Sequence, residues 1–277
     1  MALPLIVDTH ALADLRVQLQ SEGRTLLGAG ICLVDLRPAE AYAAGHIPGA
    51  VNGNAALLNR AEPPIGGLLP EPEVVNAFLA GIGANMGDQI VAYDGGRETA
   101  AARLVWVLDA YGYEANGWLS GGFSAWQADS LPVSSEASNA SAGALSLSLI
   151  GDNTLPVDTL MEHLVSPTVT VLDVRSANEF AGTDVRSARG GHVPGAKHLE
   201  WTTLLDEHGR LLGDAALEAL ITDTGASLDD TVVVYCQTHQ RSAVTYVALK
   251  HLGFMDVRAL DGAWSAWGNR DDTPIER

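Results

Sequence analysis

The residues best suited to chemistry lie together in one segment, Val232-Val-Val-Tyr-Cys-Gln-Thr-His-Gln-Arg-Ser242. Its cysteine, Cys236, ends an apolar run, and Arg241 follows after four intervening residues, where a helical pattern begins. Only the thiolate is a good nucleophile, and an ordinary thiol pKa of about 8.5 must be lowered to supply it at neutral pH. Backbone N–H groups of a short loop, the positive end of a helix, Arg241 and His239 would each lower that pKa. The segment therefore predicts a nucleophilic Cys236.

The same loop offers hydrogen-bond donors to an anionic substrate beside the sulfur. The substrate-binding residues predicted in it are Gln237, Thr238, His239, Gln240 and Arg241. A lone cysteine is often simply buried, but the polar run that follows Cys236 favours the catalytic role. The second cysteine, Cys32, lies inside an apolar run and is expected to be part of the core.

Five sequence blocks occur twice in the same order, which indicates a tandem duplication. They include Asp-x-Arg, Gly-His-Ile/Val-Pro-Gly-Ala and Leu-x-Gly-Gly/Ala-x-Ser-Ala-Trp. The paired blocks are 34–37 with 172–175, 45–50 with 191–196, 90–94 with 232–236, 110–113 with 251–254, and 119–126 with 260–267. Asp94 stands where the second copy has Cys236, so the first copy lacks the nucleophile.

The chain of 277 residues is long enough for two domains, each with its own core. Small polar residues dominate from 134 to 143, which is typical of an exposed connector. We therefore predict an N-terminal domain over 1–133, a linker over 134–147 and a C-terminal domain over 148–277.

Continuous apolar strands alternate with helical patterns in each half, which predicts an α/β fold. The expected strands are 31–34, 90–93, 169–172 and 231–235, and two of the expected helices are 99–110 and 242–251. Each domain should be a mostly parallel sheet with helices on both faces. In such sheets, ligands bind beyond the carboxyl ends of strands, which is where Cys236 lies.

The duplicated blocks, with a Cys-to-Arg loop only in the second copy, resemble the two-domain rhodaneses over nearly the whole chain outside the linker. The loop is similar to that of bacterial thiosulfate:cyanide sulfurtransferases, which have His where this chain has Gln240. The resemblance implies that Cys236 takes the outer sulfur of thiosulfate as a persulfide, releases sulfite and passes the sulfur to cyanide or a thiol acceptor. It implies no cofactor and no metal, and a catalytically silent first domain, because the Asp94 carboxylate cannot carry a persulfide.

Charged pairs at the strand ends, Asp35 with Arg37 and Asp173 with Arg175, occur in both copies. Their presence in the copy without a thiol favours a structural role, and we expect Glu40 and Glu179 to join them. The same reasoning makes four further residues structural, namely His46, His192, Trp126 and Trp267.

An insertion in the second copy adds two candidate substrate anchors, Arg186 and Arg189. Mammalian rhodaneses and mercaptopyruvate sulfurtransferases have a substrate-binding Arg in a block resembling residues 179–182, where this chain has Glu179. This departure disfavours 3-mercaptopyruvate as the sulfur donor.

Four functions fit the loop to different degrees. A thiosulfate sulfurtransferase is favoured, because a cationic loop suits a small dianion. The alternatives are a 3-mercaptopyruvate sulfurtransferase and a persulfide carrier that delivers sulfur to an acceptor protein. A phosphatase or arsenate reductase is disfavoured, because those enzymes use a longer Cys-x5-Arg loop.

Charge and hydropathy exclude several partner classes. Sixteen Lys and Arg against 34 Asp and Glu give a net charge of -18, which disfavours nucleic acid and anionic membranes. The first residues resemble no signal peptide, and no apolar run is long enough to span a bilayer, so we expect a cytoplasmic protein. The two cysteines lie about 200 residues apart, so the sequence predicts no disulfide framework.

We expect a monomer, because the two copies can cover each other's exposed faces.

Overall fold

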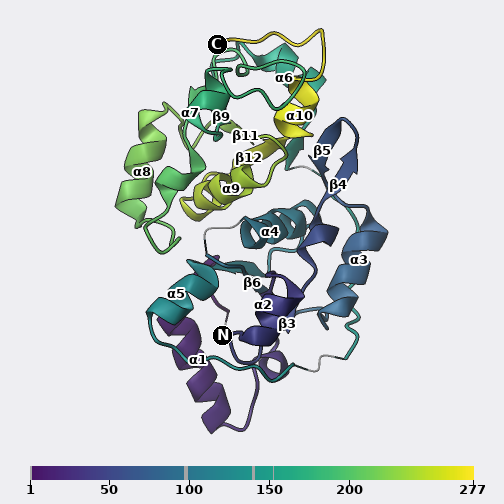
Figure 1. The fold of residues 1–277 in the computed structure, drawn as a ribbon, viewed down its shortest axis with the longest axis vertical. Coiled ribbons are helices and arrows are strands. Elements are labelled where there is room, and N and C mark those ends of the chain that lie inside the picture. Colours follow the sequence, from purple (N-terminus) through teal and green to yellow (C-terminus); the bar gives the residue numbers. More distant parts are fainter. Residues whose placement is uncertain (1, 97–98, 139–140, 152) are drawn as a thin grey trace. The chain divides into compact units, whose positions relative to one another are not determined.

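Two parallel β-sheets organise the chain, one in each of two units (Figure 1). The computed structural model describes residues 2–96, 99–138, 141–151 and 153–277. Unit 1 comprises Met1–Leu58, Pro70–Ile150 and Asp206–Leu211, and unit 2 comprises Asn59–Leu69, Gly151–Leu205 and Leu212–Arg277.

The strands and helices of each unit follow the expected alternation. Unit 1 contains β1 (Ile6–Val7), α1 (Thr9–Ser21), η1 (Leu27–Ala29), β2 (Ile31–Asp35), α2 (Ala39–Ala44), β3 (Val51–Asn52), η2 (Ala55–Leu58), α3 (Pro72–Gly81), β6 (Gln89–Tyr93), α4 (Ala100–Ala110), β7 (Asn116–Leu119) and α5 (Gly122–Ala128). Unit 2 contains β4 (Arg60–Glu62), β5 (Ile65–Leu68), β8 (Thr154–Leu155), α6 (Val157–His163), β9 (Val169–Asp173), α7 (Ala177–Phe180), β10 (Lys197–His198), η3 (Trp201–Leu204), α8 (Asp214–Asp223), β11 (Thr231–Tyr235), α9 (Arg241–His251), β12 (Asp256–Leu260) and α10 (Ala263–Trp267).

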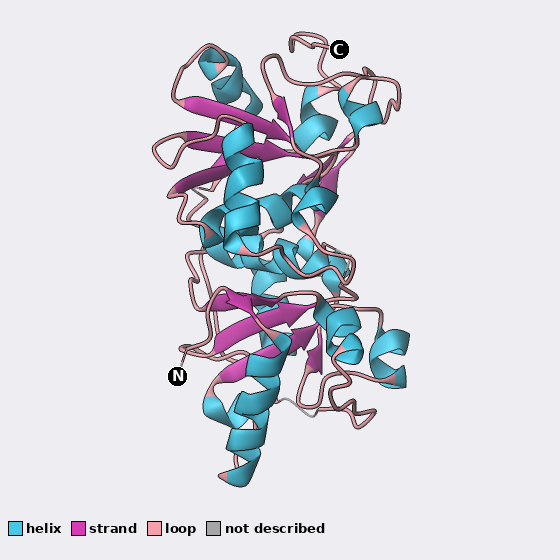
Figure 2. Cartoon of the chain, turned by 90° about the vertical axis from the view of Figure 1, so that its left-hand side faces the viewer, coloured by secondary structure: helices cyan, strands magenta, loops and turns pink. Residues whose placement is uncertain are grey.

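The two sheets have the same topology, which confirms the duplication. Their strand orders are β1-β7-β6-β2-β3 in unit 1 and β8-β12-β11-β9-β10 in unit 2, and all pairs within them are parallel. Figure 2 shows helices on both sides of the strands. The predicted fold class, α/β with a mostly parallel sheet in each domain, is therefore confirmed.

Alternate residues of the central strands face two helical layers. On β11, Val233 and Tyr235 pack into one apolar cluster with α6 and α10, while α9 contacts β11 and β12. Unit 1 repeats this arrangement, with Val91 and Tyr93 of β6 in a cluster with α1 and α5. The central strand of each sheet is thus buried on both faces, as its continuous apolar sequence predicts.

The segment predicted as a linker is hydrogen-bonded to unit 1 along much of its described length; residues 139–140 lie outside the described part. Ser134 forms a backbone bridge with His46, and the Gly143 and Leu147 N–H groups donate to Ala80 O and Asn76 Oδ1. The boundary between the units accordingly comes at Ile150, a few residues later than the composition suggests. The reason is that backbone groups make most of these bonds, and composition does not reveal them.

Each unit also includes a short segment from the other half of the sequence. Unit 2 takes residues 59–69, where β4 and β5 form an antiparallel hairpin, and unit 1 takes residues 206–211. The two segments occupy equivalent places in the repeat, between a 3-10 helix and the next α-helix. Nothing in the repeated sequence blocks predicts that residues 59–69 belong to unit 2 or that residues 206–211 belong to unit 1.

Candidate active site

The end of strand β11 positions Cys236 next to the start of helix α9. The loop is fixed to α10 by backbone bonds, in which the Trp264 and Ser265 N–H groups donate to Cys236 O and Gln237 O at 2.9 and 3.0 Å. The Cys236 side chain is fully buried, with 0% exposure. Access to the sulfur is therefore restricted.

The loop between Cys236 and Arg241 turns polar groups toward the sulfur. The backbone N–H groups of Thr238 and Ser242 and the hydroxyl of Ser242 hydrogen-bond to it. His239 has a φ of +50°, in the left-handed region that few side chains adopt. This conformation lets the chain reverse direction within the four residues between Cys236 and Arg241.

The pKa of the Cys236 thiol is the sum of opposing effects. Burial alone would raise this pKa, because a thiolate loses its hydration. The positive charge of Arg241 lowers it most, followed by the hydroxyl and backbone N–H of Ser242 and the N–H of Thr238. The net result is a pKa below the ordinary value, which favours the nucleophilic thiolate.

A buried carboxylate holds Arg241 in place. Glu179, at the third position of α7 and 1% exposed, accepts hydrogen bonds from both terminal nitrogens of Arg241, at 2.6 and 2.9 Å. Burial would raise the pKa of Glu179, but the Arg241 ion pair lowers it to about 2. The expectation that Glu179 belongs to the strand-end pair therefore needs correction, because its main partner is the arginine of the loop.

The strand-end pairs have the predicted structural role. Arg37 donates to Asp35 at 2.6 Å, Arg175 donates to Asp173 at 2.5 Å, and all four side chains are buried. Glu40 was expected to join the first pair, but its side chain is exposed. The repeat thus correctly predicts the two ion pairs. It does not predict the different surroundings of Glu40 and Glu179, the acidic residues that follow them.

The histidines and tryptophans that the repeat marked as structural have matching partners in both units. His46 and His192 bond through Nδ1 to the carbonyls of Tyr42 and Phe180, at 2.9 Å in each case. Trp126 and Trp267 donate to Pro132 O and Pro274 O at 2.8 Å, and both indoles are fully buried. These contacts confirm the structural interpretation.

The two inserted arginines occupy different surroundings. Arg186 is 52% exposed, pairs with Asp184 at 2.8 Å and lies 3.7 Å from Glu179, and its carbonyl accepts from Gln237 Nε2. Arg186 therefore lies beside the loop. Arg189 instead donates to the carbonyls of Trp267, Arg270 and Thr273, which ties its guanidinium to the C-terminal segment. Of the two candidate anchors, only Arg186 lies where a loop-bound anion could reach it.

The β4–β5 hairpin packs on the active loop. The Gly66 N–H donates to Ser265 Oγ at 2.9 Å, and Gln240 Nε2 is hydrogen-bonded to Asn59 Oδ1. A Cβ at Gly67 would overlap the Thr238 carbonyl, and Gly67 has a φ of +72°. Glycine is thus required where the hairpin backbone meets the loop backbone.

Sequence reasoning missed three contributors to this site, namely Glu179, Ser242 and the hairpin. Glu179 carries one recognisable signal, the Ser-x-x-Glu capping box that begins at Ser176, and the structure contains that box. The capping box predicts the helix start but not the contact with Arg241. Ser242 has no distinguishing signal, because serine is an ordinary residue in the first turn of a helix. The hairpin has none because it lies outside the repeated blocks.

In the equivalent loop of unit 1, the Asp94 carboxylate accepts hydrogen bonds from backbone N–H groups. Asp94 Oδ1 accepts from the Gly96 N–H at 2.9 Å, and Oδ2 accepts from the Ala101 N–H at 3.0 Å. Residues 97–98 of this segment lie outside the described part of the chain. A carboxylate here occupies a backbone cradle like the one that surrounds the Cys236 sulfur in unit 2.

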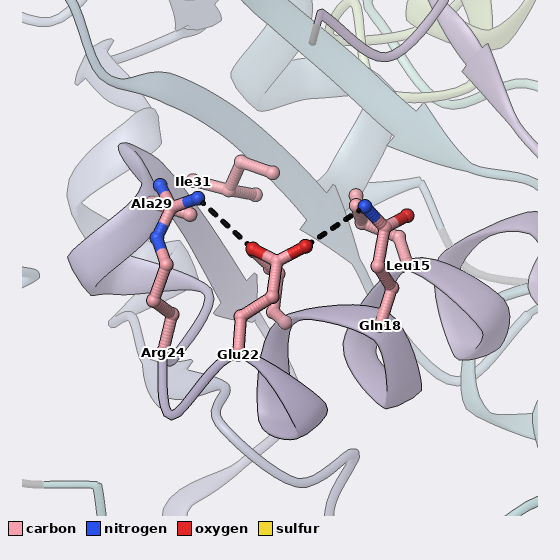
Figure 3. A pocket seen from close by; sticks show the side chains of 7 residues that line it. Leu15, Gln18, Glu22, Arg24, Ala29 and Ile31 are labelled. Carbon is pink, nitrogen blue, oxygen red and sulfur yellow. Dashed lines mark hydrogen bonds and ion pairs between the residues drawn. The ribbon is translucent and has the colours of Figure 1, made fainter.

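Two other features offer no comparable chemistry. Cys32 is buried in unit 1, donates to Ile82 O at 3.3 Å, and has its pKa raised by burial to about 12, so its predicted place in the core is confirmed. A hollow of about 230 Å³ in unit 1 (Figure 3) has polar groups that pair with one another. It is lined by Leu15, Gln18, Leu19, Glu22, Arg24, Ala29 and Ile31.

Comparisons with known proteins agree with this geometry. The family model of the rhodanese-like domain matches residues 14–129 and 156–270. The chain is 34% identical to a thiosulfate sulfurtransferase of Azotobacter vinelandii, covering 99% of this chain and 98% of that one. It is 36% identical to a thiosulfate sulfurtransferase of Pseudomonas aeruginosa, covering 99% and 97%. A crystal structure from Escherichia coli, described as a 3-mercaptopyruvate sulfotransferase, superposes with a TM-score of 0.79 at 28% identity, covering 94% of this chain and 98% of the other.

Proposed function

Because the chain belongs to the family of proteins with rhodanese-like domains, we propose that it is a thiosulfate sulfurtransferase that works through a persulfide on Cys236. The observation that carries the proposal is the buried Cys236 sulfur, surrounded by N–H donors and the Arg241 charge. Such a site stabilises an anion on sulfur both before and after the transfer.

The proposed reaction has two displacements. The Cys236 thiolate attacks the outer sulfur of thiosulfate, the sulfur–sulfur bond of thiosulfate breaks, and sulfite leaves with the bonding electron pair. The persulfide that results is anionic at its outer sulfur, where the loop N–H groups and Arg241 offset the charge. A nucleophilic acceptor such as cyanide or a thiol then attacks the outer sulfur and returns Cys236 as the thiolate. No step needs a metal or an organic cofactor.

The loop also supplies the proposed binding groups for thiosulfate. The sulfonate oxygens can accept from Gln237, Thr238, Gln240 and Arg241, while His239 acts from within the loop. Arg186 would add charge at the rim. The structural position of Arg189 gives it no such role in this proposal.

The second domain is the proposed catalytic one, and its unit includes the β4–β5 hairpin of residues 59–69. Unit 1 cannot hold a persulfide at Asp94, because a carboxylate cannot carry one. The Asp94 carboxylate already accepts hydrogen bonds from the backbone N–H groups of Gly96 and Ala101. Four statements are predictions from the sequence alone. They are cyanide as an acceptor, delivery of sulfur to an acceptor protein, a monomeric state and a cytoplasmic location.

The proposal is tested by the intact mass of the protein before and after incubation with thiosulfate, and again after cyanide. We expect a gain of one sulfur atom that is lost with cyanide, and no gain in Cys236→Ser. Cys32→Ser is the matched control and should load sulfur normally. A stable wild-type mass, with hydrolysis of an aryl phosphate instead, would replace this function with a phosphatase.

One alternative donor has specific support. The E. coli structure that superposes on this chain is described as acting on 3-mercaptopyruvate. The sequence disfavours this donor, because the chain has Glu179 in the block where the mercaptopyruvate sulfurtransferases it resembles have a substrate-binding Arg. Comparison of kcat/KM for the two donors decides between them, and we expect thiosulfate to be preferred.

A further inference from the structure

The hydroxyl of Ser242 lies between the Cys236 thiol and the His239 imidazole, two groups that can each gain or lose a proton. It hydrogen-bonds to the Cys236 sulfur, and its Oγ is 2.6 Å from Nδ1 of His239. All three side chains are buried, with exposures of 0% for Cys236 and Ser242 and 1% for His239. Water therefore has little access to the thiol proton.

A hydroxyl has one proton, which decides the direction of both hydrogen bonds. When Cys236 is a thiolate it can only accept, so the Ser242 O–H donates to sulfur and Oγ accepts from Nδ1–H of His239. When Cys236 is a thiol, the directions can reverse, with S–H donating to Oγ and the Ser242 O–H donating to Nδ1. The row of three groups can thus pass one proton between sulfur and imidazole.

We propose that Ser242 and His239 form a buried proton relay that deprotonates Cys236 and stabilises its thiolate. This inference rests on the proposed function, in which Cys236 is the nucleophile. The S–H bond breaks and its proton passes to Ser242 Oγ, while the Ser242 proton passes to Nδ1 of His239. The products are a thiolate and an imidazolium, with no net change in charge. The reverse transfer restores the thiol after the sulfur has been handed on.

The duplication supplies an independent observation. In the first copy, where Asp94 replaces the thiol, Ala100 stands at the position of Ser242 and therefore has no hydroxyl to relay a proton. The Asp35–Arg37 pair, which has only a structural role, is kept in that copy. The hydroxyl thus occurs with the thiol rather than with the fold.

Among the described residues, Arg241 and Glu179 are the charged groups nearest the relay, and the test leaves both unchanged. Arg241 at the start of α9 faces the sulfur, and Glu179 of α7 lies behind Arg241. Since Arg241 supplies the largest favourable effect on the thiol pKa, the relay must be measured with this arginine intact.

The experiment is a pH titration of the Cys236 thiolate by its ultraviolet absorbance, with the iodoacetamide rate measured in parallel. We expect Ser242→Ala to raise the Cys236 pKa by about one unit, and to slow alkylation about tenfold below that pKa. Ser242→Thr keeps a hydroxyl and should return the pKa toward the wild-type value. His239→Asn removes the imidazole while tolerating the left-handed backbone, and should also raise the pKa.

The matched control is Thr245→Val, which removes another buried hydroxyl of α9, one whose Oγ1 has no hydrogen-bond partner among the described residues. We expect its Cys236 pKa to equal that of the wild type. Equal pKa values in wild type and Ser242→Ala would overturn the relay. If Ser242→Ala fails to fold, an unchanged pKa in His239→Asn would do the same. Both measurements omit thiosulfate, so they can be read even if no persulfide forms.

Discussion

Glu179 and Arg241 lie 62 positions apart in the sequence and form a two-pronged ion pair, with distances of 2.6 and 2.9 Å. The Glu179 side chain is 1% exposed, and the Arg241 side chain is 20% exposed. The planar guanidinium fits a carboxylate through two parallel hydrogen bonds, which fixes its orientation. Glu179 thus positions the charge that acts on Cys236.

Replacement of Glu179 by Gln should cost both stability and activity. Breaking a buried pair leaves the remaining charge poorly compensated, and we expect a loss on the order of 3 kcal/mol in the free energy of unfolding. The released Arg241 should also lower kcat/KM for thiosulfate about tenfold or more. Urea denaturation and steady-state kinetics measure the two effects.

The control for Glu179→Gln is Asp256→Asn, which breaks the more exposed pair with Arg258. This variant should change the free energy of unfolding by less than about 1 kcal/mol. Similar losses in both variants would contradict the special role of Glu179.

The same ion pair predicts a pH dependence of stability. The pKa of Glu179 is lowered to about 2 in the folded chain, whereas the unfolded chain has the ordinary value of 4.5. The stabilisation is therefore complete above the ordinary value and is lost as the pH falls from about 4.5 toward 2. Urea midpoints at several pH values should show that the wild type loses its advantage over Glu179→Gln across this range. A constant difference between the two proteins would refute the prediction.

Loss of the Arg241 charge should make Cys236 a weaker nucleophile at neutral pH. Arg241 contributes the largest lowering effect on the thiol pKa, so Arg241→Ala should raise that pKa by at least about one unit. The pH profile of iodoacetamide alkylation, with the modified cysteine identified by mass, gives the pKa directly. Arg258→Ala removes a surface arginine of the same unit and should leave the profile unchanged. An unshifted profile in Arg241→Ala would show that burial and backbone N–H groups alone set the thiol pKa.

The fold could be predicted from sequence because its determinants are local and occur twice. Apolar runs such as 231–235 predicted central strands, and the repeated blocks predicted that both halves share one topology. The strand-end position of Cys236 and the helix start at Arg241 followed from the same patterns. These features depend on hydrophobic periodicity, which neighbouring residues determine.

The missing parts of the site depend on contacts between distant segments. Glu179 carries a helix-capping signal, but its bond to Arg241 exists only because α7 and the loop meet in the fold. The burial of Cys236 likewise depends on a distant segment, because the Trp264 N–H of α10 donates to the Cys236 carbonyl. No periodicity in 59–69 indicates that this segment belongs to unit 2.

The close packing of the hairpin on the active loop leads to a last prediction, for Gly67. A methyl group at this position would overlap the Thr238 carbonyl, so Gly67→Ala must push the loop or the hairpin aside. The Thr238 N–H is one of the groups that lower the Cys236 pKa. We therefore expect a higher thiol pKa and a sulfur loading rate reduced about tenfold.

Gly253→Ala separates this effect from backbone strain. Gly253 also has a positive φ, of +89°, but a Cβ there meets nothing within 4 Å. The two variants should lose similar stability from the unfavourable φ, about 1 kcal/mol each. Only Gly67→Ala should change the thiol pKa and the loading rate. If both variants load sulfur at the wild-type rate, the hairpin has no part in holding the loop, and its packing on Thr238 serves stability alone.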